Sequence, residues 1–221
     1  MEQSLPKIQL AMDTLDWDRA LELATLAAPY VDILEAGTPL VKSVGIKIVS
    51  RLKAEHPDKL VLADLKSSDV GGYEANMAFG AGADVVTTQG ITTLATIAEV
   101  QREADKWHRR AEVDMTGVLD PVARARDVRR LGVSLVLYHR SIDEELTQSA
   151  VWDEKACAAV QEMCSLKMDV AVAGGINIEL LPTLCNAPVY AIVVGRGITG
   201  QADPAEAARA VAMRVKDLWP A

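Results

Sequence analysis

The sequence predicts a (β/α)8 barrel, an α/β fold in which parallel strands close into a cylinder surrounded by helices. Three observations lead to this prediction. Eight short runs rich in Val, Ile and Leu occur along the 221 residues. A helical pattern follows each run, and parallel strands need crossover connections of this kind. Eight such repeats in a chain of 221 residues match the size and strand count of this barrel.

The strands are predicted from apolar stretches bounded by polar or turn residues. They cover residues 8–12, 31–35, 60–65, 83–88, 112–116, 135–138, 169–173 and 191–194. The helices are predicted from amphipathic patterns over residues 16–28, 39–55, 72–80, 92–107, 121–131, 153–166, 178–184 and 204–218. The last helix has the clearest start, because Asp203 can cap it, Pro204 fits its first turn and Glu206 completes the capping pattern.

An open, doubly wound sheet is the alternative arrangement. Such a sheet often carries a glycine-rich turn after its first strand. Here the first predicted strand continues into Asp13, Thr14, Leu15 and Asp16 without a glycine. Because no linker, low-complexity run or charge block interrupts the repeats, we expect a single domain over residues 1–221.

Net charge, apolar runs and cysteines indicate which partners and which cellular compartment to expect. The formal net charge of −8 disfavours nucleic acid or an anionic membrane as the main partner, although a phosphorylated small molecule needs only a few local donors. No apolar run approaches the roughly 20 residues that span a bilayer. The N-terminus lacks the apolar centre of a signal peptide. Cys157, Cys164 and Cys185 fit no zinc motif, so we expect reduced thiols and a cytoplasmic protein.

Nearly every predicted strand ends in polar residues or glycine. In chain order these are Asp13, Glu35, Gly37, Thr38, Asp64, Lys66, Asp69, Thr87, Thr88, Gln89, Gly90, Asp114, Thr116, Gly117, His139, Arg140, Ser141, Gly174, Gly175, Gly195, Arg196 and Gly197. Any one alone is more often a turn, a helix cap or a structural histidine. The strand ends of a (β/α)8 barrel meet on one rim, where its chemistry takes place, so together they indicate an active site.

Charge is concentrated after the third predicted strand. Side chains alternate along a strand, so Asp64 and Lys66 are expected to face the same side. Opposite charges kept at such a place form either a structural ion pair or part of a reaction site. Together with Glu35 and Asp13, Asp64 would form an oxygen-rich cluster that suits a hard cation such as Mg²⁺. An ion-pair network around Lys66 is the alternative explanation of this cluster.

Glycines follow the last two predicted strands and indicate a phosphate site. Backbone N–H groups can approach a ligand closely where no side chain intervenes, as at Gly174, Gly175 and Gly195. Phosphate usually binds after the seventh and eighth strands of this fold, and Arg196 would add a charge-assisted contact. Turn formation or helix packing is the alternative role of these glycines.

The Asp64-x-Lys66-x-x-Asp69 pattern resembles the D-x-K-x-x-D motif of the orotidine 5′-monophosphate decarboxylase superfamily. The chain is most similar to the sugar-phosphate branch of this superfamily, which holds the 3-hexulose-6-phosphate synthases and the 3-keto-L-gulonate-6-phosphate decarboxylases. This resemblance covers essentially the whole chain, and residues 31–38 and 171–176 resemble this branch in particular. Orotidine monophosphate decarboxylase itself and a non-catalytic sugar-phosphate-binding barrel are more distant alternatives.

The resemblance implies a Mg²⁺-dependent lyase that is a homodimer with its sites at the subunit interface. It implies that Glu35 and Asp64 bind the metal, that Lys66 contacts the reacting oxygens, and that Asp69 reaches into the partner's site. Further catalytic roles are expected for Asp64, Asp69, His139 and Asp114, and substrate contacts for Asp13, Glu35, Arg140, Gly174, Gly175, Gly195 and Arg196.

Both families of this branch form a 1,2-enediolate of a pentulose phosphate. The synthases remove a proton from D-ribulose 5-phosphate and add the enediolate to formaldehyde, whereas the decarboxylases reach it by losing CO₂. Decarboxylases typically carry Glu, Arg and Thr at the positions of Asp114, Ile142 and Ala173, and residues 71–74 also resemble a synthase. Resemblances to the decarboxylases are residues 138–141, Trp152 and residues 218–219. We expect the synthase reaction, with the decarboxylase as the alternative.

Overall fold

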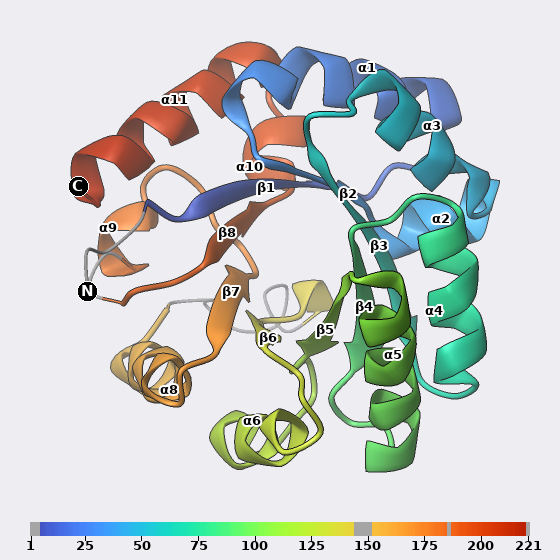
Figure 1. Cartoon of the computed structure of the whole chain (residues 1–221). Coiled ribbons are helices and arrows are strands. Elements are labelled where there is room, and N and C mark those ends of the chain that lie inside the picture. The colour runs from blue at the N-terminus through green and yellow to red at the C-terminus, as the bar shows by residue number, and fades with distance from the viewer. Residues whose placement is uncertain (1–4, 144–151, 185–186, 220–221) are drawn as a thin grey trace.

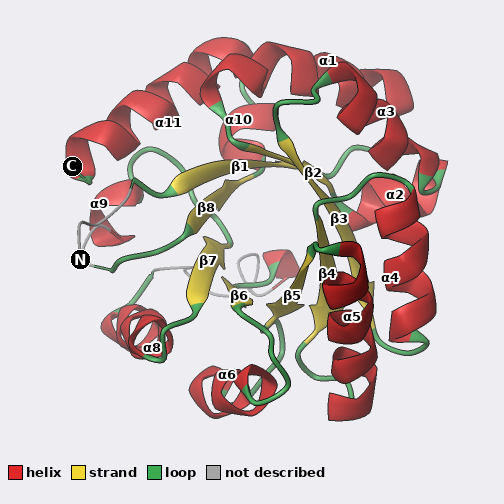
Figure 2. Cartoon of the chain, in the orientation of Figure 1, coloured by secondary structure: helices red, strands yellow, loops and turns green. Residues whose placement is uncertain are grey.

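The computed structural model describes residues 5–143, 152–184 and 187–219. Its strands form one closed parallel barrel in chain order, from β1 to β8, and its helices surround the barrel (Figures 1 and 2). The predicted fold class is therefore confirmed. The strands are β1 (Lys7–Met12), β2 (Ile33–Ala36), β3 (Leu60–Ser67), β4 (Val85–Gln89), β5 (Arg110–Asp114), β6 (Leu135–His139), β7 (Asp169–Ala173) and β8 (Ala191–Val194).

Helices follow the strands where the sequence pattern predicts them. They are α1 (Trp17–Ala27), η1 (Ala28–Tyr30), α2 (Thr38–Val44), α3 (Lys47–Glu55), α4 (Gly71–Gly80), α5 (Leu94–Trp107), α6 (Pro121–Arg129), α8 (Glu154–Ser165), α9 (Leu181–Leu184), α10 (Arg196–Thr199) and α11 (Pro204–Leu218). The short helices η1 and α10 were not predicted. The predicted cap of the last helix is confirmed, because the Asp203 carboxylate accepts a 3.0 Å hydrogen bond from the Glu206 N–H. None of the helices in the described ranges is long and apolar enough to cross a membrane.

Most predicted boundaries differ from the structure by one to three residues. Two of the differences have reasons that the structure shows. The helix expected over residues 39–55 is two helices, because Gly45 between them has φ +81° and ψ 173°, a conformation that ends α2. The fifth strand was expected at residues 112–116 but lies two residues earlier. Its end is fixed by Asp114, whose Oδ1 accepts the N–H and the hydroxyl of Thr116 and turns the chain away from the barrel.

Buried apolar side chains form two cores. The larger one lies between the strands and the surrounding helices. The smaller one fills the barrel itself with Ala11, Ile33, Leu62, Val85, Leu135, Leu137, Ala171, Ala173, Ala191 and Val193. This mostly apolar inner layer closes the barrel below the ends of the strands. Cys157 and Cys164 are free thiols, and Cys185 lies outside the described residues.

Candidate active site

A cavity of about 1030 Å³ opens among the carboxyl ends of the strands. The predicted site residues that line it are Asp13, Glu35, Asp64, Lys66, His139, Gly174, Gly175, Gly195 and Arg196. Other side chains also line it. Thr38 and Thr116 were noted only as polar strand ends and Ile142 only as a position that separates the two families, whereas Arg19, Asn177 and Gln201 were not singled out. The structure thus brings nine of the predicted residues into one common cavity.

Asp114 lies beside the lining residues and joins two of them. Its Oδ2 is 2.6 Å from the Lys66 Nζ and 2.9 Å from the His139 Nδ1. Its Oδ1 is held by Thr116, and the side chain is only 1% exposed. Hydrogen bonds and charge from His139 and Lys66 outweigh burial, so the pKa of Asp114 lies below its ordinary value. Asp114 is thus an anion that orients His139 and leaves its Nε2 as the nitrogen that can take a proton.

Lys66 reaches the cavity through an irregularity in β3. The sequence predicts that plain strand alternation places Lys66 beside Asp64, but the β3–β4 register shifts between Ala63 and Ser67, and Lys66 has φ +48°. A bulge of this kind redirects a side chain, at a cost in backbone strain of about 1–3 kcal/mol. The Lys66 N–H is nevertheless satisfied by the Thr87 hydroxyl at 2.9 Å. The prediction that the two charged groups meet is correct, although regular alternation does not bring it about.

The Lys66 ammonium lies between two carboxylates. Its Nζ is 3.0 Å from the Asp64 Oδ2 and 2.6 Å from the Asp114 Oδ2. Burial lowers the pKa of Lys66, but the two carboxylates raise it by more, so its pKa lies above the ordinary value. Lys66 is therefore a fixed cation at the edge of the cavity.

Asp64 is held rigidly by hydroxyl groups. Its Oδ1 accepts a hydrogen bond from Thr87 and its Oδ2 accepts one from Thr38, both at 2.6 Å. Both threonines were noted as polar strand ends, but neither was given a role, because a contact across neighbouring strands leaves no local pattern. In the structure, a Cβ on Gly37, directly before Thr38, would lie 2.7 Å from the Met12 carbonyl oxygen and would collide with Asp13. Such a glycine marks two strand ends that approach closely.

The carboxylates on β2, β3 and the end of β1 repel each other. Glu35 is 7% exposed, and Gln9 donates to its Oε2 at 2.8 Å. Burial, followed by the charges of Asp64 and Asp13, raises the pKa of Glu35 well above its ordinary value. Burial and the charge of Asp64 likewise raise the pKa of Asp13. Bringing these acids together without a cation is costly, so their arrangement suits a positive ligand.

Glu35 and Asp64 are the two groups that could hold a Mg²⁺ ion. No cluster of three or more His, Cys, Asp or Glu side chains that could hold a metal occurs among the described residues. Two carboxylates are nevertheless a usual protein contribution to a Mg²⁺ site, because that ion keeps several waters and shares oxygens with its substrate. The hard oxygen donors and their mutual repulsion therefore fit this ion.

Glu112 is a buried acid beneath the site that was not predicted. It is 1% exposed, and its Oε1 has no hydrogen-bond partner in the described part of the protein. Burial, with the charges of Asp114 and Asp64, raises the pKa of Glu112 to about 8. Glu112 precedes Asp114 by two residues on β5, and this period-2 spacing, which places both acids on one face of the strand, is the signal that could have identified it.

Besides Asp114, two predicted residues lie outside the cavity lining, Asp69 and Arg140. Asp69 is exposed in the loop between β3 and α4, where its Oδ1 accepts the Val70 N–H at 2.8 Å. Its predicted role in a partner's site is compatible with this position and stays a prediction. Arg140 does not line the cavity, but its backbone packs against Gly174 and its N–H donates to the Ala173 carbonyl at 3.1 Å. Its predicted contact with the substrate also stays a prediction.

A closed barrel with a charged cavity at its strand ends defines a (β/α)8 enzyme, and comparisons with known proteins narrow this class. Residues 6–211 match the orotidine 5′-phosphate decarboxylase / HUMPS family. A 3-hexulose-6-phosphate synthase of Mycobacterium gastri is 39% identical over 92% of this chain and 96% of its own. The 3-keto-L-gulonate-6-phosphate decarboxylase UlaD of Escherichia coli is 35% identical over 98% of this chain and 99% of its own.

Solved structures agree with this comparison. KGPDC from Streptococcus mutans, in a crystal structure with a bound ligand, is 30% identical, covers 98% of this chain and 100% of its own, and superposes with a TM-score of 0.94. The chain belongs to the orotidine 5′-phosphate decarboxylase / HUMPS family. It is a lyase related to both enzymes of the sugar-phosphate branch.

Proposed function

We propose that the protein is a 3-hexulose-6-phosphate synthase, which adds formaldehyde to D-ribulose 5-phosphate. The observation that carries the proposal is the contact of Lys66 and His139 with one buried carboxylate, Asp114, at the edge of one cavity. A fixed cation and an oriented base on the same carboxylate are what formation of an enediolate requires.

We infer that Glu35 and Asp64 hold a Mg²⁺ ion. When bound, the ion would polarise the substrate's carbonyl and so make the proton at C1 more acidic. The hydroxyls of Thr38 and Thr87 keep the Asp64 carboxylate in one orientation. The raised pKa of Glu35 also predicts that divalent cation and proton compete for this carboxylate.

His139 and Lys66 divide the proton and charge transfers. The Nε2 of His139 takes the proton from C1 of D-ribulose 5-phosphate, and the resulting imidazolium is stabilised by Asp114. The Lys66 ammonium stabilises the negative oxygen of the enediolate. C1 then forms a bond to the carbon of formaldehyde, and the new alkoxide oxygen receives the proton from His139.

The substrate's phosphate is assigned to the other side of the cavity. Gly174, Gly175, Gly195 and Arg196 line that side. Gly174 and Gly175 have φ of +108° and +63°, a left-handed conformation that glycine adopts without strain. Backbone N–H groups in such turns form anion-binding sites, and Arg196 adds a charged donor.

Ile142 supports the synthase over the decarboxylase. It lines the cavity at the position where the decarboxylases typically carry arginine, while Arg140 does not line it. An ordered water on an arginine would protonate the enediolate, whereas an apolar side chain leaves the enediolate free to react with formaldehyde. Decarboxylation of 3-keto-L-gulonate 6-phosphate remains the second candidate, since relatives of both kinds cover nearly the whole chain.

An exposed apolar surface supports a homodimer. Five large apolar side chains, here called the α4–α5 apolar face, are 38–78% exposed. They are Val70, Tyr73, Met77, Ile91 and Leu94. They lie on or next to α4 and α5, which pack side by side (Figure 1). Several large apolar side chains exposed on two neighbouring helices are typical of an interaction site. Asp69 directly precedes this face, so pairing of two such faces would bring Asp69 toward the partner's cavity.

A pair of assays tests the proposed reaction. With Mg²⁺, the protein should consume D-ribulose 5-phosphate only when formaldehyde is present, and it should release CO₂ from 3-keto-L-gulonate 6-phosphate much more slowly. The Ile142→Arg variant should reduce the first rate and raise the second. Faster decarboxylation than aldol addition in the wild-type protein would replace the proposal with the second candidate. If EDTA lowers neither rate, the proposed requirement for Mg²⁺ is wrong.

A further inference from the structure

Trp152 contacts the turn that carries the two cavity glycines. Its indole N–H donates a 3.0 Å hydrogen bond to the Gly174 carbonyl oxygen. The side chain is 4% exposed and packs against Tyr138, with ring centroids 5.5 Å apart. Tyr138 directly precedes His139 on β6, so one tryptophan contacts the ends of both β6 and β7.

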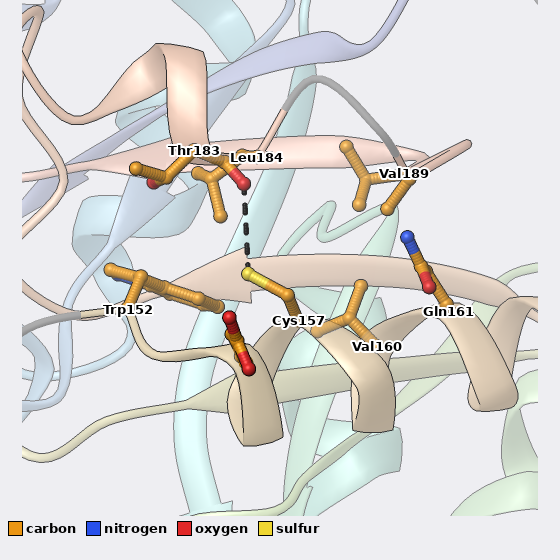
Figure 3. Close-up of a pocket in the computed structure, with 9 residues that line it drawn as sticks. Trp152, Cys157, Val160, Gln161, Thr183, Leu184 and Val189 are labelled. Carbon is orange, nitrogen blue, oxygen red and sulfur yellow. Dashed lines mark hydrogen bonds between the residues drawn. The ribbon is translucent and has the colours of Figure 1, made fainter.

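Trp152 lies on the outer side of this turn. It forms one wall of a second, smaller hollow of about 240 Å³ between α8 and α9, where Cys157, Thr183 and Leu184 face it (Figure 3). None of the residues that line this hollow also lines the active-site cavity. The Gly174 carbonyl is thus held from the side of the helices, while Gly174 and Gly175 themselves line the active-site cavity.

The geometry of a peptide unit connects the two sides. The carbonyl oxygen of Gly174 and the N–H of Gly175 belong to one planar trans unit and point in opposite directions. A carbonyl held toward Trp152 therefore turns the Gly175 N–H away from Trp152. Two consecutive glycines could otherwise rotate this unit easily, because neither has a side chain that fixes it.

Arg140 fixes the position of the glycine turn, so the turn as a whole cannot shift. A Cβ on Gly174 would lie 2.6 Å from the Cβ of Arg140, so the two backbones are already in close contact. The Arg140 N–H is bonded to the Ala173 carbonyl at 3.1 Å, which continues the pairing of β6 with β7. Because the position of the turn is fixed in this way, the motion that remains is rotation of the Gly174–Gly175 peptide.

We propose that Trp152 is a positioning residue that orients the Gly174–Gly175 peptide so that the Gly175 N–H donates to the substrate's phosphate. The proposal rests on the phosphate site assigned above and adds the residue that sets its geometry. The alternative is that Trp152 only fills space beside Tyr138. The two roles differ in the indole N–H, which packing does not use.

The test compares Trp152→Phe with Trp219→Phe. Phenylalanine keeps an aromatic ring against Tyr138 but removes the donor together with part of the volume of the indole, and the control variant loses the same volume. Trp219 is a matched control, because it is 3% exposed and its indole N–H donates to the Ala187 carbonyl at 3.3 Å, away from the active-site cavity. Calorimetry with inorganic phosphate and steady-state kinetics with D-ribulose 5-phosphate are measured for both variants and for the wild-type protein.

We expect Trp152→Phe to bind inorganic phosphate about tenfold more weakly and to raise KM by a similar factor, the size of one lost hydrogen bond, with kcat little changed. Trp219→Phe should match the wild-type protein in both. Wild-type affinity in Trp152→Phe would overturn the role of Trp152 alone. A wild-type protein that binds no phosphate would overturn the phosphate site itself, and this proposal with it.

A second measurement needs no variant. In the wild-type protein, the backbone amide resonance of Gly175 should move progressively as inorganic phosphate is added, because its N–H donates to the anion. An amide resonance that stays unchanged while phosphate binds would show that this N–H does not face the anion, and would overturn the proposal even if Trp152→Phe failed to fold.

Discussion

Asp114 is 1% exposed, yet it decides what two less buried neighbours can do. By accepting from the His139 Nδ1, it fixes which ring nitrogen is free to act as a base. By pairing with Lys66, it keeps a cation next to that base. The sequence predicted all three residues as catalytic but gave no way to predict that one carboxylate oxygen serves both of the others, because that depends on where β3, β5 and β6 meet in the closed barrel.

The first prediction at this scale concerns His139. In D₂O without formaldehyde, the wild-type protein should exchange the C1 proton of D-ribulose 5-phosphate, and His139→Asn should slow this exchange by roughly 10²–10⁴-fold, the usual contribution of a general base. Exchange is followed by proton NMR. The control is His108→Asn, the same change at the left-handed residue that ends α5, where asparagine is well tolerated. Exchange in His139→Asn at the rate of the control would assign the base to another residue.

The second prediction concerns the buried Glu112. Its pKa is about 8 in the folded protein, against an ordinary value of 4.5. At low pH, the carboxyl is protonated in both states. As the pH rises toward 8, the unfolded chain releases the proton and the folded protein retains it, so the free energy of unfolding falls. Glu112→Gln removes this titration. Between pH 4 and pH 8, the free energy of unfolding of Glu112→Gln should therefore rise relative to that of the wild-type protein by on the order of a few kcal/mol.

Urea unfolding of both proteins at several pH values, with EDTA present, measures this difference. The gap between Glu112→Gln and the wild-type protein should widen steadily up to about pH 8 and then stay constant. A gap that is the same at pH 5 and pH 8 would mean that the carboxyl of Glu112 ionises in the folded protein as readily as in the unfolded chain.

Elements were predicted well where their patterns are local. The apolar runs of β7 and β8 and the capped start of α11 determine their own boundaries, and these were predicted to the residue. The boundary of β5 was wrong because it depends on an Asp114–Thr116 turn, which competes with continued pairing. The bulge in β3 could not be predicted either, because only the register between β3 and β4 reveals it. Hydrogen bonds across strands, such as those of Thr38 and Thr87, depend on the assembled sheet in the same way.

Gly45 carries the prediction at the scale of elements. It separates α2 from α3 with φ +81° and ψ 173°, a region that is nearly restricted to glycine. No atom lies within 4 Å of a Cβ placed there, so Gly45→Ala tests the backbone strain alone. We expect a loss of about 1–3 kcal/mol in the free energy of unfolding, with kcat unchanged.

A glycine in an ordinary conformation is the control. Gly80 ends α4, is exposed like Gly45, and would also have no atom within 4 Å of an added Cβ, so Gly80→Ala should be neutral or slightly stabilising in the same urea experiment. Equal stability of the two variants would show that the break between α2 and α3 does not depend on glycine.

At the scale of the whole molecule, the barrel is well predicted because its eight repeats each carry the same information. One wrong boundary does not change the strand count, and the count determines closure. The assembly of two chains is different, because a single sequence contains no direct record of a partner. The observations that support the proposed dimer are the α4–α5 apolar face and Asp69 at its edge, outside the cavity of its own chain.

Mixed dimers test the shared site directly. If each site combines Lys66 of one chain with Asp69 of the other, then Lys66→Ala and Asp69→Asn should each be nearly inactive as pure proteins. A dimer with one chain of each kind contains one site with both residues intact. Unfolding and refolding an equal mixture should therefore restore roughly a quarter of the wild-type activity, because half of the dimers are mixed and half of their sites are complete.

Mixing Lys66→Ala with His139→Asn should restore nothing, because these residues lie in the same cavity of one chain and every mixed dimer then has a defect in both sites. No recovery in the first mixture, while native mass spectrometry shows that mixed dimers have formed, would mean that Asp69 does not complete the partner's site, and full activity of Asp69→Asn alone would place Asp69 outside the catalytic site. If sedimentation shows a monomer, the α4–α5 apolar face does not pair two copies of this chain, and the proposed dimer is wrong.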